Sequence, residues 1–320
     1  MKRRDFFQLA AGALLATGAA STRSRLSAQS SAGPGPLKID IYSRHLQWLR
    51  TADEVAEAAI EMGFDGVNVT VRPYPGHVDP DNVAKELPPF VNALRKHGLL
   101  VRSITTNISD ADPAAERIVG AASSLGITHY WWGTYRYDLS KPIYEQLDAL
   151  KPRVAKIAAL SEKYRMTAAY HTYSMPATVG SVMWDLLLLL REHDPKHVGF
   201  HYDTGHESHH INGLWEVNLR AAGPYIVALA VKDYAPEQNS GVKGEERGWR
   251  TRSVPLGMGL VNLPQIAKAL ADIRFSGPVE IQAEYPNGGA DSAQDYITLP
   301  RAQVLGAMKR DLQTLRKGFA

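Results

Sequence analysis

Several features are missing from the chain of 320 residues, and each absence narrows its function. It has no cysteine, which fits an exported protein that forms no disulfides. No glycine-rich turn of the dinucleotide- or phosphate-binding type occurs. No basic stripe with interleaved aromatic residues is present, which argues against nucleic-acid binding. Its apolar runs fall short of the roughly 20 residues that span a bilayer, so no stable membrane span is expected.

The composition is that of a globular protein. Apolar residues make up 44% of the chain, enough for a full core in one large α/β domain or two small ones. The formal charge is +3, but five basic residues lie near the N-terminus. When these five residues are left out, the rest of the chain has a slightly negative net charge.

Residues 1–30 predict a twin-arginine export signal, because paired arginines precede an apolar run and then small residues. The alternative, a retained membrane anchor, fits less well because the run is short. Residues 31–36 form a predicted linker. We therefore expect a periplasmic or otherwise exported protein.

Residues 37–320 show eight short β-branched runs that alternate with longer amphipathic stretches. The predicted strands are 37–43, 66–72, 99–106, 128–133, 166–171, 197–203, 225–233 and 277–284. Eight such units in this length predict an α/β fold, a single-domain (β/α)8 TIM barrel. A doubly wound sheet is the alternative, but it would leave the number of units unexplained.

In a TIM barrel, functional residues lie at the C-terminal ends of the strands and in the loops that follow. His171, Asp203 and Glu284 stand at the predicted ends of strands five, six and eight. Two carboxylates and one imidazole suit a divalent metal such as Mn²⁺, Mg²⁺, Co²⁺ or Zn²⁺. Alternatively, Asp203 caps a helix or pairs with Lys232, and His171 binds a backbone carbonyl.

The stretch "GFHYDTGHESHH" (199–210) is rich in histidine, but its residues are expected to differ in role. Asp203 ends the strand, and His206 lies within reach of a substrate. His201 shares the face of Asp203 by the two-residue period of a strand. His209 and His210 are assigned to the loop surface.

Four other residues near strand ends are candidate substrate-binding groups, namely His45, Arg72, His77 and Trp131. Arg72 could hold a carboxylate or phosphate, or could equally form a salt bridge that locks its loop. Trp131 and Trp132 should face opposite sides of the strand, so that one can stack on a sugar and the other joins the core.

The two residues at the end of predicted strand seven should also face opposite sides of the strand. Lys232 is expected to face the barrel interior and Asp233 the helices. The polar segment 237–252 predicts a long loop, either a lid or a surface excursion.

The chain resembles the sugar phosphate isomerase/epimerase family of the xylose isomerase-like TIM barrel superfamily. The likeness rests on the stretches "GFDGVNVTVRPYPGHVDPDNV", "YDTGH", "VKDY", "VPLGMGLVNL" and "GPVEIQAEY". It implies a metal set of glutamate, aspartate, histidine and glutamate on strands five to eight. Asp203 matches the aspartate, and His206 matches a histidine that contacts substrate.

Two positions depart from the set that the resemblance implies. His171 stands for the first glutamate, and Ala230 stands for the histidine. On strand eight, either Gln282 or Glu284 takes the last position.

From these residues we expect a metal-dependent sugar isomerase or epimerase that works through an enediolate-type intermediate. Glu284, His206 and Lys232 are the predicted catalytic residues: either Glu284 or His206 is the base, and the metal and Lys232 together stabilise the enolate oxygen. The alternatives are a keto-sugar lyase, a metal-dependent hydrolase and a non-catalytic sugar-binding barrel. The expected partner is a small carbohydrate, and a homo-oligomer is left open.

Overall fold

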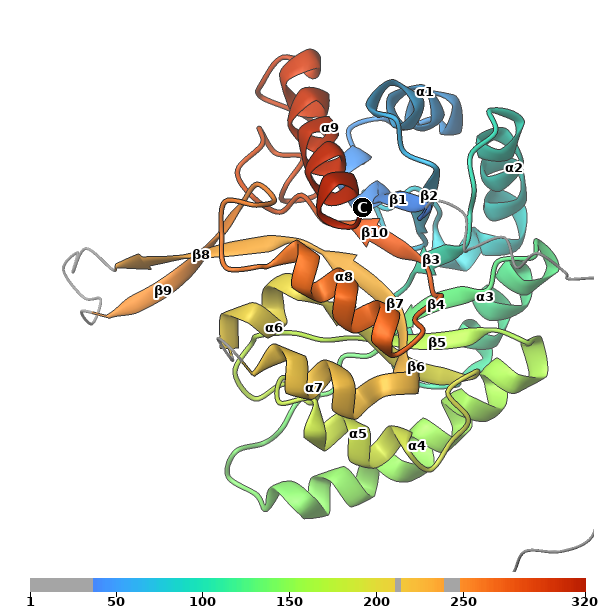
Figure 1. Cartoon of the computed structure of the whole chain (residues 1–320). Coiled ribbons are helices and arrows are strands. Elements are labelled where there is room, and N and C mark those ends of the chain that lie inside the picture. The colour runs from blue at the N-terminus through green and yellow to red at the C-terminus, as the bar shows by residue number, and fades with distance from the viewer. Residues whose placement is uncertain (1–36, 211–213, 239–247) are drawn as a thin grey trace, which may run out of the picture. The chain divides into compact units, whose positions relative to one another are not determined.

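The computed structural model describes residues 37–210, 214–238 and 248–320. Within these residues, parallel strands close into a barrel that is surrounded by helices (Figure 1). The barrel strands are β1 (Ile39–Tyr42), β2 (Gly66–Thr70), β3 (Ser103–Thr105), β4 (His129–Trp132), β5 (Thr167–His171), β6 (Val198–Asp203), β7 (Ile226–Val231) and β10 (Val279–Ile281). Around the barrel they follow one another in chain order, and β10 closes it against β1. The predicted (β/α)8 barrel is confirmed.

Each barrel strand is followed by at least one helix. The α-helices are α1 (Ala52–Met62), α2 (Val83–Lys96), α3 (Pro113–Ser124), α4 (Ile143–Tyr164), α5 (Trp184–Leu190), α6 (Thr204–His210), α7 (Trp215–Ala222), α8 (Leu263–Asp272) and α9 (Arg301–Gly318). The described part of the chain also contains the short 3-10 helices η1 (Ser43–Leu46), η2 (Pro80–Asn82) and η3 (Gly223–Tyr225).

Local sequence explains where α1 begins and ends. Thr51 and Glu54 form a reciprocal capping box, as expected for an N-cap threonine. Gly63 ends the helix in the left-handed conformation (φ 92°), which a glycine adopts without steric cost.

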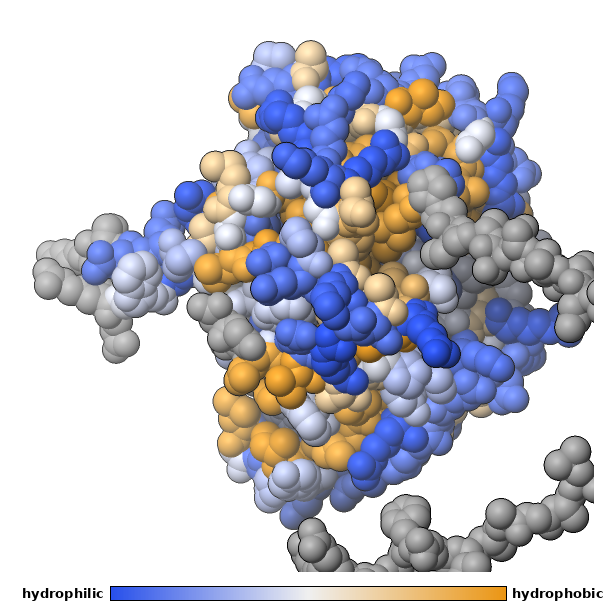
Figure 2. Space-filling view, in the orientation of Figure 1, coloured by the Kyte–Doolittle hydropathy of each residue, from blue (hydrophilic) through white to orange (hydrophobic). Residues whose placement is uncertain are grey.

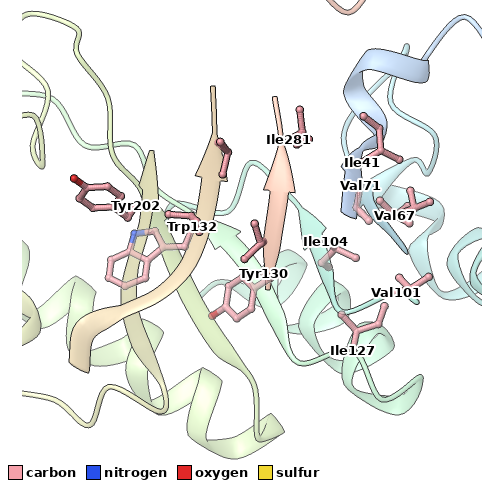
Figure 3. Packing of buried hydrophobic residues seen from close by; sticks show 14 of the residues in the cluster. Ile41, Val67, Val71, Val101, Ile104, Ile127, Tyr130, Trp132, Tyr202 and Ile281 are labelled. Carbon is pink, nitrogen blue, oxygen red and sulfur yellow. The ribbon is translucent and has the colours of Figure 1, made fainter. Parts of the chain in front are cut away.

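The two faces of the strands differ sharply in polarity. On β6, Phe200 and Tyr202 join the apolar layer between strands and helices, whereas His201 and Asp203 lie buried on the opposite face. Figure 3 shows part of this apolar layer, with Tyr130, Trp132 and Tyr202 beside the strands. The apolar core therefore lies outside the barrel wall, and much of the barrel interior is polar.

Both ends of the predicted loop 237–252 are strands, whereas its middle, residues 239–247, lies outside the described residues, so a lid or surface excursion there stays a prediction. Residues on either side of 239–247 pair as an antiparallel hairpin of β8 (Asp233–Gln238) and β9 (Trp249–Val254), which extends from the barrel in Figure 1. Its strands were missed because their residues are mainly polar and lack a buried alternating face.

Two further expectations concern export and membrane association. The predicted export signal and linker, residues 1–36, lie outside the described residues, and export stays a prediction. No helix in the described part of the chain has the length and hydropathy needed to cross a membrane.

Apolar side chains gather on one part of the outer surface, in the region of α5 (Figure 2). A groove here is lined by residues of α4, α5 and the loops before them, including the exposed Tyr144, Val182 and Trp184. The homo-oligomer stays a prediction.

Asp233 fixes the loop between β9 and α8, as expected for a side chain that faces away from the barrel interior. Its carboxylate accepts hydrogen bonds from the backbone N–H groups of Gly257, Gly259 and Val261 at 2.9–3.0 Å. Gly259 passes so close that an added Cβ would lie 2.3 Å from a carboxylate oxygen of Asp233. The loop is therefore built around this one side chain.

We predict that Asp233→Ala lowers the free energy of unfolding by about 3 kcal/mol, because three N–H groups lose a charged acceptor. Urea unfolding followed by tryptophan fluorescence measures this change. Asp148→Ala is the matched control, since Asp148 is exposed and pairs with Lys151 on the surface of α4, where about 0.5 kcal/mol is expected. Equal losses in the two variants would contradict the role of Asp233.

Candidate functional site

Four polar side chains meet at the C-terminal end of the barrel, where the fold places functional groups. Asp203 ends β6, His206 lies in α6, Lys232 follows β7 directly, and Glu284 lies three residues beyond β10. The first three are buried, and the side chain of Glu284 is 28% exposed. We call these four residues the Lys232 cluster.

The ammonium group of Lys232 is the centre of this cluster. Its Nζ lies 3.0 Å from Oδ2 of Asp203, 2.8 Å from Oε2 of Glu284 and 2.9 Å from Nε2 of His206. Gln282 lies slightly farther away, with its Oε1 at 3.4 Å. Lys232 therefore faces the interior, as predicted, and both Gln282 and Glu284 reach it.

The position of His206 follows from the local sequence. Asp203 precedes α6, and its Oδ1 accepts a hydrogen bond from the backbone N–H of His206 at 2.9 Å, as an N-cap residue does. Because an ammonium group can only donate, Nε2 of His206 accepts from Lys232. The ring proton then lies on Nδ1, 2.7 Å from Oγ of Ser174.

Burial and charge set the protonation of the cluster in opposite directions. Burial by itself lowers the pKa of Lys232, but Asp203 and Glu284 outweigh it and hold the pKa above its ordinary value. Burial raises the pKa of Glu284, and the nearby Lys232 outweighs this and brings it to about 2. Lys232 is therefore a fixed cation and Glu284 a fixed anion near neutral pH.

His171 continues the polar network from the end of β5. Its Nε2 lies 3.3 Å from Oδ2 of Asp203, and its ring stacks on Trp131 with centroids 4.2 Å apart. Burial, and then the charge of Lys232, lower the pKa of His171 well below its ordinary value. His171 is therefore a neutral imidazole.

A second polar layer lies deeper in the barrel. His201 approaches His171 through the two Nδ1 atoms at 3.4 Å, and its Nε2 lies 3.7 Å from Glu280. Glu280 accepts hydrogen bonds from Gln282 at 2.8 Å and from Asn68. Burial raises the pKa of Glu280 to about 8, although these two hydrogen bonds oppose the rise.

Of the predicted substrate-binding residues, Arg72 and Trp131 lie beside the cluster. The Arg72 guanidinium lies over the Trp131 ring at 5.3 Å and donates to the backbone oxygen of Thr106. Trp131 faces the interior, whereas Trp132 packs against Tyr170 in the outer layer. This division between the two tryptophans was expected.

The two other predicted substrate-binding residues, both histidines, are held by the backbone. His45 is buried and its Nδ1 contacts the backbone oxygen of Ala290 at 3.0 Å. His77 uses both ring nitrogens within its own region, on Thr70 and on the backbone oxygens of Leu46 and Leu49. Those contacts account for both ring nitrogens of His77 without a substrate.

Sequence reasoning placed Tyr173 among the polar groups at the strand ends but gave it no role, and it missed Ser174 and Tyr234. The ring of Tyr173 lies 4.6 Å from that of His171, and the ring of Tyr234 lies 5.7 Å from that of His206. Both tyrosines are partly exposed. Each lies two residues after a strand-end residue of the site, Tyr173 after His171 and Tyr234 after Lys232, and this spacing could have indicated that both border the site.

The metal prediction fits these residues in part. Within the described residues, His171, Asp203 and His206 offer ligand atoms that all lie within 4.8 Å of one another. His206 thus takes the place in the metal set that was predicted for Glu284, which instead binds Lys232. Ala230 supplies no ligand, and two of the three groups, Asp203 and His206, already contact the Lys232 ammonium. The described residues therefore offer three ligands and not the four that the resemblance implies.

Residues 56–305 match the family model described as xylose isomerase-like TIM barrel. The chain belongs to this family. Among curated proteins, no sequence matches the chain.

Solved structures of xylose isomerase-like barrels are similar to the chain over nearly their full length. An E. coli 3-keto-D-glucoside 4-epimerase is 14% identical (TM-score 0.60), covering 87% of this chain and 99% of that one. A D-psicose 3-epimerase from Clostridium cellulolyticum H10, with D-tagatose, is 16% identical (0.64; 88% and 99%). A Mycobacterium smegmatis barrel protein in complex with magnesium is 19% identical (0.59; 89% and 98%). At these identities the likeness establishes the fold.

The raised pKa of Glu280 predicts a pH dependence of stability. Between pH 5 and pH 8 the folded protein keeps a proton that the unfolded chain has released, so this group makes stability fall as pH rises. Glu280→Gln removes the titration. The stability of the variant relative to the wild type should therefore improve by about 2 kcal/mol from pH 5 to pH 8.

Urea unfolding of both proteins at four pH values checks this expectation. Glu162→Gln serves as the control, because it makes the same substitution at an exposed position on α4. Parallel stability curves for the wild type and Glu280→Gln would show that Glu280 is ionised in the folded protein.

Proposed function

We propose that the protein moves a proton at the carbon next to a carbonyl group of a small sugar or keto sugar, as an isomerase or epimerase. The observation that carries the proposal is the Lys232 ammonium, which joins Asp203, His206 and Glu284 at the barrel mouth. Removing such a proton leaves negative charge on the carbonyl oxygen. A fixed cation is the group that stabilises this charge.

Glu284 is the proposed base. It is the member of the cluster with the most exposed side chain and is ionised at neutral pH. Its basicity is suppressed chiefly by Lys232. When Lys232 instead donates to a substrate oxygen, the carboxylate regains basicity beside the C–H bond that breaks.

His206 is the proposed second proton-transfer group. Like the base it contacts the Lys232 ammonium, and Ser174 and the backbone contact with Asp203 hold its ring in place. An epimer forms when His206, having taken a proton from water on Nε2 after Lys232 turns to the substrate, returns it to the opposite face of the same carbon, while Glu284 keeps the proton it removed. A proton returned to the former carbonyl carbon, with one moved between the two oxygens, gives an isomer.

The rim of the site supports a sugar as the substrate. Tyr173 and Tyr234 are partly exposed aromatic side chains next to hydrogen-bonding groups, a combination that suits the apolar face and hydroxyl groups of a sugar. Arg44 lies 3.9 Å from Glu284 and adds a further donor. We propose an unphosphorylated sugar, since no glycine-rich phosphate loop is present and the N-terminus predicts export.

Loss of an oxygen substituent from the same enolate would make the protein a lyase, and analysis of the product distinguishes the two outcomes. The names of the structurally similar proteins suggest the first compounds to test, namely D-tagatose and a 3-keto-D-glucoside.

We predict that the wild type, in deuterium oxide, incorporates solvent deuterium at the carbon next to the carbonyl group. Glu284→Gln should slow this exchange by about 100-fold or more, because the base is lost. Mass spectrometry and proton NMR measure the exchange. Glu162→Gln makes the same substitution on an exposed helix face and should exchange at the wild-type rate. A wild type that binds keto sugars without exchange would instead be a sugar-binding barrel.

A further inference from the structure

The place where a divalent ion would be expected already holds a positive charge. Asp203 and His206, two of the three residues that could share a metal, bind Nζ of Lys232 at 3.0 and 2.9 Å. Oε2 of Glu284 lies 2.8 Å from the same ammonium. An ammonium group has three protons, and its hydrogen bonds run to His206, Gln282 and Glu284, while Asp203 pairs with it by charge.

The site already holds at least as much positive as negative charge without an ion. Asp203 and Glu284 carry two negative charges, and Lys232 and Arg44 carry two positive ones, with Arg44 at 3.9 Å from Glu284. Arg72 adds further positive charge beside Trp131. A divalent ion next to the buried Lys232 would therefore add two positive charges that no described carboxylate of the cluster balances.

The chain also holds Lys232 firmly in this position. Oγ1 of Thr204 donates to the backbone oxygen of Lys232 at 2.8 Å and accepts from its backbone N–H at 3.1 Å. Gly205 leaves room for the lysine stem, since a Cβ there would lie 2.7 Å from Cγ of Lys232. The residues between Asp203 and His206 thus serve to seat the lysine.

We propose that the Lys232 ammonium takes the place of the divalent metal, so that the protein works without a metal and uses Lys232 as its electrophile. This deepens the proposed function by naming the cation that binds the substrate oxygen. The claim that the protein binds no metal does not depend on the proposed function, because metal binding is measured without a substrate.

The test is cobalt binding to the untagged full chain, since Co²⁺ absorbs in the visible range when imidazole and carboxylate bind it. Calorimetric titration of the wild type with Co²⁺, Zn²⁺ and Mn²⁺ should show no stoichiometric binding. Lys232→Met keeps an unbranched side chain but removes the charge, and frees His171, Asp203 and His206. This variant should bind one Co²⁺ per chain, about 100-fold or more tighter than the wild type.

Three further variants make the result specific to the site. Lys232→Arg keeps the positive charge and should bind no Co²⁺. The double variant Lys232→Met with Asp203→Ala should lose the binding that Lys232→Met gains. Lys268→Met, on an exposed position of α8, is the matched control and should behave as the wild type.

Two outcomes would overturn the inference. One is stoichiometric binding of a metal to the wild type that Asp203→Ala abolishes, a measurement that does not depend on the folding of any Lys232 variant. The other is a folded Lys232→Met chain that binds no Co²⁺. A metal-free wild type that exchanges no deuterium would leave the inference standing and defeat the proposed function. A wild type that binds a metal and needs it for deuterium exchange would defeat the inference and leave the proposed proton-transfer function standing.

Discussion

The buried ion cluster around Lys232 is the interaction on which the candidate site depends. Asp203 comes from β6, Lys232 follows β7 and Glu284 follows β10, so the cluster ties together the ends of three neighbouring strands. A buried ion pair is costly to desolvate and contributes little net stability compared with apolar packing. Its presence at the barrel mouth is better explained by chemistry than by folding.

The fold separates the source of stability from the site of chemistry. Apolar residues such as Phe200 and Tyr202 pack between the strands and the surrounding helices. Inside the barrel, His171, His201 and Glu280 form a buried polar path instead of the layers of branched aliphatic residues that usually fill this fold. Because the outer layer supplies the apolar burial, the interior can carry groups that contribute little to stability.

The positions at which this chain departs from the metal set implied by its family are consistent with one another in the structure. Ala230 pairs with Asp203 in β6 and with Glu280 in β10, so its small side chain lies between two polar neighbours. Gln282 links Lys232 to Glu280, with its oxygen near the ammonium and its nitrogen donating to the carboxylate. Ala230 removes one ligand of that set, and His171 replaces a charged glutamate with a neutral imidazole. Both changes occur in a barrel whose interior holds the ammonium group of Lys232.

Local sequence was enough to predict the fold and the directions in which several strand residues face. The two-residue period of the strands predicted that Trp131 and Trp132 face opposite sides, as Lys232 and Asp233 do, and the count of repeating units indicated a (β/α)8 barrel. Each of these depends on residues close together in the chain. The polar hairpin of β8 and β9 had no such local pattern and was read as a loop.

The centre of the site was decided only by tertiary structure. Period two shows which side of a strand a residue faces, but not which residues from other strands share its depth. Barrel closure brings Glu284 to Lys232 across 52 positions and Asn68 to Glu280 across 212. Whether Lys232 or a metal joins Asp203 to its partners depends on distances across the barrel, which no spacing along the chain contains.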